Sequence, residues 1–206
     1  MSKLYKNVIF DFGNVLVQWQ PFNALSHLFD DETQMTARLT EIGFFDWNIE
    51  QDRGRNVEDG LKLVAERPDD ERSVFESYIE NIAAAHKNQV PGTAQILNSL
   101  HSNNVATYGL SNAPEIAFET VQQTVPEITL MENITISARV GLVKPDVRIF
   151  KHCLAENKID PSETVFVDDS AANCATAEAL GIRSHQFVDA ERLDKWLQGM
   201  GLLDAV

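Results

Sequence analysis

Short apolar runs, each ended by polar residues, recur along this chain and predict buried strands. One run is Val8-Ile9-Phe10, which Asp11 follows, and a later one is Val165-Phe166-Val167, which Asp168 and Asp169 follow. Continuous apolar runs of this length are typical of strands in a parallel sheet that is covered on both faces. Because ligands bind just beyond the carboxyl ends of such strands, we expect the three carboxylates to gather at one edge of one sheet.

Strands and helices are predicted to alternate in the second half of the chain. Apolar runs predict strands, and amphipathic stretches predict helices, in the order strand 104–110, helix 114–123, strand 134–136, helix 146–156, strand 164–168, helix 171–180, strand 183–187 and helix 190–198. This alternation is typical of βαβ units. The sequence therefore predicts an α/β fold with a doubly wound parallel sheet.

The segment between the first and second predicted strands follows a different pattern. From about residue 21 to residue 87, apolar positions recur at helical spacing and β-branched runs are almost absent. This pattern predicts an all-helical insertion after the first strand. We therefore expect a core made of residues 1–17 and 90–206 and a small helical domain at residues 18–89, with a hinge where the chain crosses between them.

Composition narrows the classes of function. The chain has 17 Lys and Arg against 31 Asp and Glu, a net charge of −14, which argues against nucleic acid as a partner. No window approaches the roughly 18 apolar residues of a membrane span, and the amino terminus has no apolar signal-peptide region, so we expect a cytoplasmic protein without a membrane partner. Cys153 and Cys174 lack metal-type spacing and are expected to be reduced core residues.

Two further segments bring polar residues to the predicted sheet edge. The run 105–110 leads into Ser111 and Asn112, and Gly141-Leu142-Val143 delivers Lys144 to the start of a helix. Carboxylates that lie close together repel one another, and a cluster of oxygen ligands suits a hard cation such as Mg²⁺. The histidines are scattered over different elements, which disfavours a zinc site or a catalytic triad.

With Asp11, Ser111, Lys144 and the pair Asp168-Asp169 in this order, the chain resembles the haloacid dehalogenase-like (HAD) superfamily. The resemblance spans almost the whole chain, and the helical insertion lies where that family places its cap domain. It implies a Rossmann-like core and a Mg²⁺-dependent phosphatase. Such an enzyme hydrolyses a small phosphorylated metabolite through an aspartyl-phosphate intermediate.

The resemblance implies a role for each residue that matches a family motif. Asp11 is the expected nucleophile, since a carboxylate can attack phosphorus and form an intermediate that water then cleaves. Lys144 is expected to bridge the phosphate and the Asp11 carboxylate, and so to bind substrate and neutralise charge as the phosphoryl group moves. Ser111 and Asn112 are expected to bind the phosphate, although this segment is also a good helix cap.

The expected magnesium ligands are Asp11, the carbonyl of Gly13 and Asp169. Asp168 either supports these ligands or replaces Asp169 as an alternative ligand. Asn173 matches the family's acid-or-amide position at the start of the next helix. Without the resemblance, the same acidic pair would be interpreted as a helix cap.

One position departs from the pattern of most family phosphatases. Two residues after the nucleophile they have a second Asp, the general acid and base, and this chain has Gly13. Family members with an Asp-x-Gly-Asn-Val first motif include hexose 1-phosphate phosphatases, such as those acting on α-D-glucose 1-phosphate, which favours a sugar 1-phosphate as substrate. Without a donor, rates should fall steeply as the leaving alcohol becomes more basic, unless the cap or a bound water supplies the proton.

The helical insertion also offers substrate contacts. Similar proteins place this part of the cap over the active site, and Trp47, Gln51 and Arg53 are the residues we expect to contact substrate, as an aromatic face and polar groups. The alternative is a helix end capped by Gly54 with solvated arginines.

Two other functions remain open at this point. The same fold hosts 2-haloacid dehalogenases, which attack carbon without a metal and also lack the second Asp. They carry a small hydroxyl residue at the position of Asp169, which favours the phosphatase. The other alternative is a catalytically impaired phosphosugar-binding protein, and the intact Asp11 argues against it.

Overall fold

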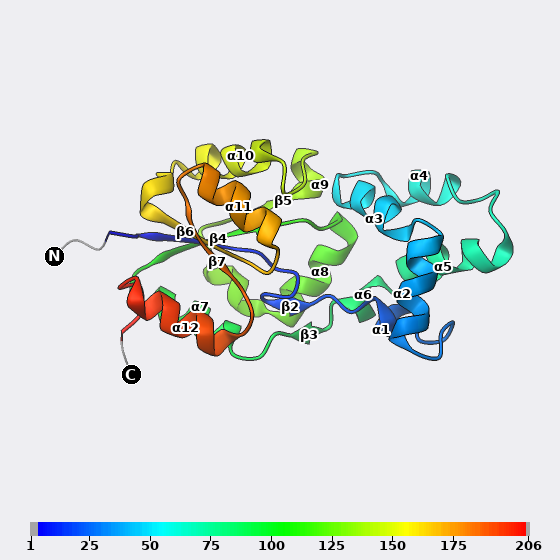
Figure 1. Cartoon of the computed structure of the whole chain (residues 1–206), viewed down its shortest axis with the longest axis horizontal. Helices are drawn as coiled ribbons and strands as arrows, with labels where there is room; N and C mark the ends of the chain where they lie inside the picture. The colour runs from blue at the N-terminus through cyan, green and yellow to red at the C-terminus, as the bar shows by residue number, and fades with distance from the viewer. Residues whose placement is uncertain (1–3, 205–206) are drawn as a thin grey trace.

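A five-stranded parallel sheet forms the centre of the structure, which is a computed structural model that describes residues 4–204. Its strands follow the spatial order β5-β4-β1-β6-β7. Their bounds are Asn7–Phe10 for β1, Ala106–Ser111 for β4, Asn133–Ile136 for β5, Thr164–Asp168 for β6 and Arg183–Gln186 for β7. The carboxyl ends of β1, β4 and β6 therefore lie side by side (Figure 1).

Helices cover both faces of this sheet, as the alternation of side chains along β1 requires. Val8 and Phe10 point into one apolar cluster, whereas Ile9 points into the cluster on the other face. The first cluster is closed by α7 (Thr93–Ser102), α8 (Glu115–Thr124) and α12 (Ala190–Gly199), and the second by α10 (Val147–Asn157) and α11 (Ala171–Ala179). Burial on both faces explains why the strands read as continuous apolar runs.

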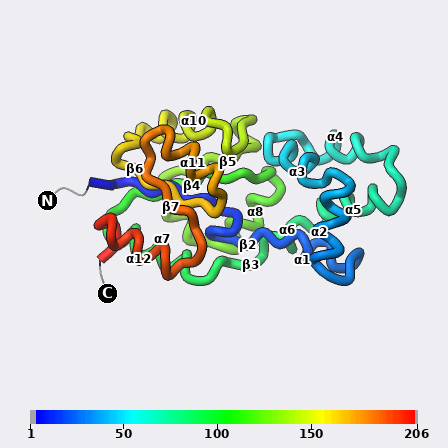
Figure 2. Tube along the Cα trace, viewed as in Figure 1, coloured from blue at the N-terminus to red at the C-terminus, as the bar shows by residue number. Residues whose placement is uncertain are grey.

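The helices that follow β1 form a second body with its own core. They are α1 (Pro21–Leu25), α2 (Glu32–Glu41), α3 (Phe44–Asp52), α4 (Val57–Lys62), α5 (Asp69–Glu80) and α6 (Ile82–Ala85). The rings of Phe44 and Tyr78 pack edge to face with centroids 4.8 Å apart, and Phe75 joins them in this core. Figures 1 and 2 show these helices at one end of the molecule, beyond α8.

A short ribbon lies where the chain crosses between these two bodies. β2 (Val17–Gln18) pairs antiparallel with β3 (Asn88–Gln89). The sequence did not predict this ribbon, because two residues a strand are too few to show alternation. The boundaries at residues 18 and 89 and the hinge remain predictions, and residues 1–3 and 205–206 of the expected core lie outside the described residues.

The α/β fold with a doubly wound parallel sheet is confirmed. The predicted strand 164–168 has the same bounds as β6, and the predicted final helix 190–198 ends one residue before α12 does. The short helix α9 (Ser137–Val140) and the 3₁₀ turns Pro126–Leu130 and Pro161–Glu163 were not predicted.

Cys153 and Cys174 are free and buried. Within residues 4–204, every helix is too short or too polar to cross a membrane.

Candidate active site

Asp11 and Asp168 lie next to each other because β1 and β6 end together. Phe10 pairs with Val167, and the amide of Asp11 donates to the carbonyl of Val167 at 2.8 Å. Asp11 is 7% exposed and Asp168 is fully buried. Asp169 follows at once, and each of the three carboxylates offers an oxygen within 4.8 Å of the other two. The structure thus gathers the three acids that the sequence placed at one edge.

Lys144 lies between two of these carboxylates. Its Nζ is 2.8 Å from Oδ1 of Asp11 and 2.7 Å from Oδ2 of Asp168, and its side chain is 1% exposed. The amide of Asn112 holds the backbone of Lys144 from both sides, since Oδ1 accepts from its N–H at 2.8 Å and Nδ2 donates to its carbonyl at 3.0 Å. Asn112 therefore positions Lys144 in addition to lining the cavity described below.

Burial and the neighbouring charges have opposite effects on the pKa values of Lys144 and Asp11. Burial alone would lower the pKa of Lys144, but the adjacent Asp11 and Asp168 outweigh it and raise that pKa above its ordinary value. Burial raises the pKa of Asp11 to about 7, although Lys144 lowers it. The cluster thus holds three carboxylates and one ammonium, which contacts two of them. The excess of negative charge and the all-oxygen donor set fit a hard divalent cation.

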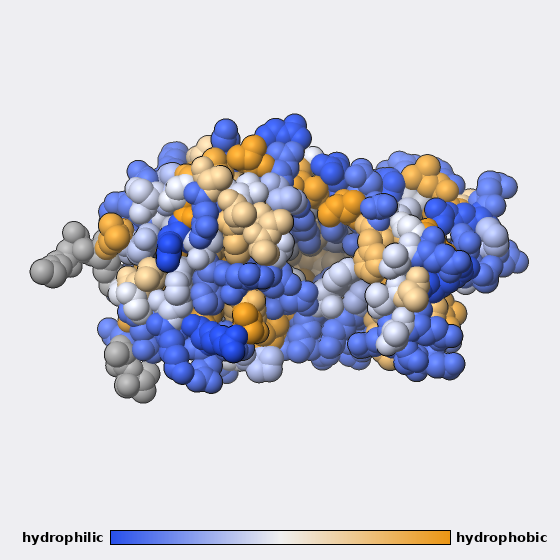
Figure 3. Space-filling model, in the orientation of Figure 1, coloured by the Kyte–Doolittle hydropathy of each residue, from blue (hydrophilic) through white to orange (hydrophobic). Residues whose placement is uncertain are grey.

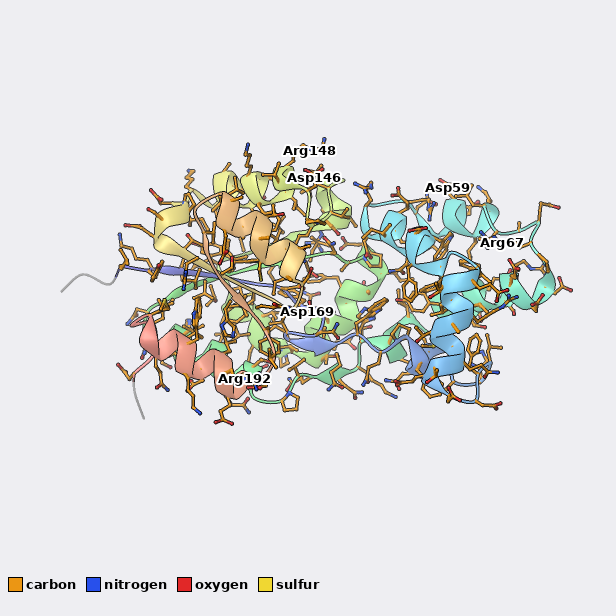
Figure 4. The ribbon with its side chains drawn as sticks, in the orientation of Figure 1. Asp59, Arg67, Asp146, Arg148, Asp169 and Arg192 are labelled. Atoms are coloured by element: carbon orange, nitrogen blue, oxygen red, sulfur yellow. The ribbon has the colours of Figure 1, made fainter. Side chains whose placement is uncertain are left out.

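The two adjacent acids at the end of β6 have different surroundings. Both oxygens of Asp168 are engaged, because Oδ1 accepts from the amide of Ser170 at 2.8 Å and from Nδ2 of Asn173 at 2.9 Å, and Oδ2 accepts from Lys144. Asp169 is only half-buried and lines the cavity. Figure 4 shows it on the side of the core that faces the helices α1–α6. Of these two acids, Asp169 is therefore the one with an oxygen, Oδ1, available to a ligand.

Asn14 is a site residue that the sequence analysis did not single out. Its Nδ2 donates to Oδ2 of Asp169 at 3.2 Å, and its Oδ1 accepts from the amide of Trp19 at 3.1 Å. Its φ is 56°, a left-handed conformation that Asn adopts more readily than most residues. The signal in the sequence was an Asn in the turn that follows the acid at the end of a strand. The side chain of Asn14 links the acidic cluster to the segment that leads to α1.

A cavity of about 190 Å³ lies between this edge of the sheet and the helical domain. Figure 3 shows the visible face hollowed between the two bodies. The core lines it with Asp11, Phe12, Gly13, Asn14, Val17, Ser111, Asn112, Ala113, Pro114, Val121 and Asp169, and the remaining lining residues are Trp19, Asn48, Asp52, Tyr78 and His86. Ser111 is buried at the end of β4. Asp11, Gly13, Ser111 and Asp169 thus share one cavity.

The three expected contacts from the helical domain lie elsewhere. Trp47 is in that domain's core, where its Nε1 donates to the carbonyl of Gly60 at 2.9 Å. Gln51 is 1% exposed and lies against the same glycine. Arg53 forms an ion pair with Glu50 at 3.2 Å. The structure does not bring these side chains to the cavity.

The residues of α3 that border the cavity each lie one position after a residue that was predicted to contact substrate. Asn48 and Asp52 line the cavity, and their spacing of four places them on the same face. The carboxyl of Asp52 is buried, which raises its pKa to about 7 against the opposing effect of Lys144. Of the predicted contacts on this helix, Trp47 lies in the core of the helical domain and Gln51 is buried against Gly60 instead.

Two more titratable side chains complete this wall. His86 directs Nδ1 at the carbonyl of Ile82 at 3.0 Å, and burial lowers its pKa. The hydroxyl of Tyr78 accepts from Nε1 of Trp19 at 3.1 Å, and burial raises its pKa. Aromatic rings therefore form part of the cavity wall opposite the core.

The chain is similar in sequence to a known protein family and to a fungal protein. The family model of haloacid dehalogenase-like hydrolases matches residues 5–181. The sesquiterpene phosphatase astK of Aspergillus oryzae is 28% identical over 201 residues, which are 92% of this chain and 93% of that protein.

Solved structures share the fold. An HAD family enzyme of Bacteroides thetaiotaomicron, crystallised with magnesium and inorganic phosphate, has a TM-score of 0.70 and 22% identity, with 90% of this chain and 95% of that chain covered. A dehalogenase crystallised with an intermediate complex has a TM-score of 0.65 and 14% identity, with 89% and 85% covered. The fold alone therefore does not separate phosphatases from dehalogenases.

Proposed function

Because the chain belongs to the haloacid dehalogenase-like hydrolase family, we propose that it is a phosphatase that hydrolyses small phosphate monoesters at Asp11. The observation that carries this proposal is the buried Lys144 between Asp11 and Asp168, with the carboxylate of Asp169 in the adjoining cavity. A buried ammonium beside a nucleophilic carboxylate suits a reaction in which a dianionic phosphate must approach an anion. The relative named a sesquiterpene phosphatase supports the same activity.

Magnesium is the cofactor that the donor set fits. Asp11, the carbonyl of Gly13 and Asp169 are the residues proposed to hold it, while Asp168 stays with Lys144 and Asn173. When bound, the ion would supply positive charge that offsets the charge of the phosphate and of the three acids. The related enzyme crystallised with magnesium and phosphate supports this choice.

The residues of the chain suggest how the reaction proceeds. Oδ1 of Asp11 is held by Lys144 at 2.8 Å and by the amide of Phe12 at 2.6 Å, so Oδ2 is the oxygen proposed to attack phosphorus. The bond from phosphorus to Oδ2 forms while the bond to the leaving oxygen breaks, and the leaving oxygen takes up a proton. Water then attacks phosphorus and releases the carboxylate. Ser111 and Lys144 are proposed to bind the phosphate oxygens.

The alternatives fit the site less well. A dehalogenase attacks carbon and needs no cation, so the carboxylate of Asp169 in the cavity would have no role. A phosphosugar-binding protein without catalysis would not need Asp11 held in place by Lys144 and the amide of Phe12.

Two classes of leaving group fit different observations. The first motif favours a sugar 1-phosphate, whose anomeric oxygen leaves without a strong acid. The cavity wall includes Phe12, Val17, Trp19, Tyr78 and Val121, and these aromatic and aliphatic side chains favour the phosphate of an apolar alcohol. The name of the Aspergillus relative supports the second class.

Phosphate release from a small panel tests the proposal. The panel contains p-nitrophenyl phosphate, glucose 1-phosphate, glucose 6-phosphate and farnesyl phosphate, each assayed with Mg²⁺ and with excess chelator. We expect hydrolysis that needs Mg²⁺. No release from any of the four esters, or undiminished release in chelator, would contradict the proposal. The ratio of the glucose 1-phosphate rate to the farnesyl phosphate rate decides between the two leaving groups.

A further inference from the structure

We propose that Asp52, which the helical domain contributes to the cavity, donates the proton to the leaving group in place of the acid that is absent at Gly13. This inference rests on the phosphatase function proposed above. It assigns a catalytic role to a residue outside the motifs of the core.

Asp52 brings a carboxyl group that forms no hydrogen bond with the described residues to the cavity of the candidate active site. Asp52 is 8% exposed and lines the same cavity as Asp11 and Ser111. Within residues 4–204, its carboxyl takes part in no hydrogen bond or ion pair, whereas its backbone carbonyl is bonded to Ser137. A buried carboxylate without a hydrogen-bond donor is costly, so the protonated form is favoured there.

The position of Asp52 on its helix acts in the same direction. It is the last residue of α3, and the carboxyl end of a helix carries a partial negative charge that disfavours another anion. Burial raises the pKa of Asp52 to about 7, and Lys144 is the charge that opposes this rise. The hydroxyl of Tyr78 and the ring of His86 border the same cavity and are uncharged. An acid that titrates near neutral pH can donate a proton and later accept one.

The other titratable side chains of this wall are poorer donors. A carbonyl oxygen only accepts, so Nδ1 of His86 carries the proton in its bond to Ile82, and Nε2 has none to donate in the neutral ring. Burial lowers the pKa of His86, which keeps the ring neutral. Burial raises the pKa of Tyr78 above that of an ordinary phenol, so it is a weak acid. Asp52 is therefore the group on this wall suited to donate.

The contact between the two bodies holds Asp52 at the site. Oγ of the fully buried Ser137 donates to the carbonyl of Asp52 at 2.5 Å and accepts from the amide of Ala113 at 3.0 Å. Ala113 is two residues after Ser111 at the end of β4. The backbone of Asp52 is thus bonded, through one hydroxyl, to the loop that follows the proposed phosphate-binding serine.

Gly54 makes this close approach possible. Its φ is +101°, and a Cβ at this position would lie 2.6 Å from the carbonyl oxygen of Ala138 in α9. Both the conformation and the space therefore require glycine. The end of α3 and the start of α9 meet backbone to backbone, which fixes where Asp52 lies relative to the core.

The proposed proton transfers balance over one turnover. As phosphorus forms its bond to Asp11 and the leaving oxygen departs, the proton of Asp52 passes to that oxygen and leaves a carboxylate. In the second half, water attacks the phosphorus of the Asp11 phosphate and gives its proton to Asp52. The bond between phosphorus and Asp11 breaks, and both side chains return to their starting states.

The test compares leaving groups in Asp52→Asn, which is nearly isosteric. For an alkyl phosphate, we expect kcat/KM to fall by about 10²–10⁴-fold, the usual contribution of general acid catalysis. For p-nitrophenyl phosphate, whose leaving group departs without a proton, kcat/KM should change little. Asp46→Asn is the matched control, because Asp46 is an exposed acid on the same helix and should leave both values unchanged.

Two further readouts separate catalysis from structure. A donor must be protonated, so the wild-type kcat/KM for the alkyl ester should fall as pH rises through about 7, and this limb should be absent in Asp52→Asn. Gly13→Asp should restore alkyl-ester hydrolysis in the Asp52→Asn background. A Cβ at Gly13 meets no atom within 4 Å, so the turn accepts the side chain.

The outcomes distinguish the two proposals. Wild-type protein that hydrolyses none of the esters refutes the phosphatase function. If the wild type is active, an equal loss on aryl and alkyl esters in Asp52→Asn, or no loss on either, refutes the role of Asp52.

Discussion

Replacing Lys144 by Met should show how much of the free energy of unfolding depends on the ammonium group of this residue. The substitution removes the cation that lies 2.8 Å from Asp11 and 2.7 Å from Asp168, both of which are almost inaccessible to solvent. Met fills much of the same volume, so the main loss is electrostatic. Removing one partner of a buried ion pair typically costs about 3–5 kcal/mol. For a chain of this size, this corresponds to a fall in Tm of about 6–20 °C.

The effect should depend on pH with a definite sign. Lys144 lowers the folded-state pKa of Asp11, whereas burial and the neighbouring Asp168 raise it, so without Lys144 that pKa should rise further above its unfolded value. The folded state then binds more protons than the unfolded state, so the free energy of unfolding falls as pH rises. The deficit of Lys144→Met relative to the wild type should therefore be largest above pH 7 and should shrink as the solution is acidified toward pH 5.

Urea unfolding, followed by circular dichroism at several pH values in chelator, measures this deficit. Lys151→Met is the matched control, because Lys151 is exposed on α10, and its effect should be close to zero at every pH. Added Mg²⁺ should recover more stability in Lys144→Met than in the control, because it replaces part of the missing charge. A deficit below about 1 kcal/mol, or one that grows on acidification, would refute this account of the Lys144 site.

Three further substitutions test single contacts. Asp11→Asn should abolish turnover while the fold persists, because an amide cannot form the acyl-phosphate, and turnover in carefully purified mutant would remove Asp11 from that role. Asp169→Asn should weaken Mg²⁺ binding, measured by calorimetry, together with activity, and loss of activity at unchanged affinity would contradict its role as a ligand. Ser137→Ala should lower kcat/KM for alkyl phosphates more than for p-nitrophenyl phosphate, because it releases the backbone of Asp52, and equal losses on both esters would contradict this role.

The core edge of the site was predictable, whereas the wall opposite was not. Asp11 follows β1 and Asp168 ends β6, and both strands are buried on both faces. A parallel sheet brings the carboxyl ends of such strands together regardless of what lies above them. Residues 47 and 51 of α3 are an aromatic and a polar side chain, as expected on a face that binds substrate. Residues 48 and 52 look like solvent positions, because the sequence does not show which side of a short helix meets a second body. A change of one residue rotates the chosen face by about 100°.

The β2–β3 ribbon has a consequence for how such a protein can diversify. Both passages of the chain between the two bodies run side by side at residues 17–18 and 88–89, so everything between them behaves as one insert with adjacent ends. On the proposals above, the nucleophile and the magnesium ligands belong to the host sheet, while the insert carries the wall for the leaving group and its proton donor. Exchange of the insert between relatives would transfer the choice of alcohol and the acid that protonates it in one event. An acid at position 13 would then be dispensable only in chains whose insert brings its own.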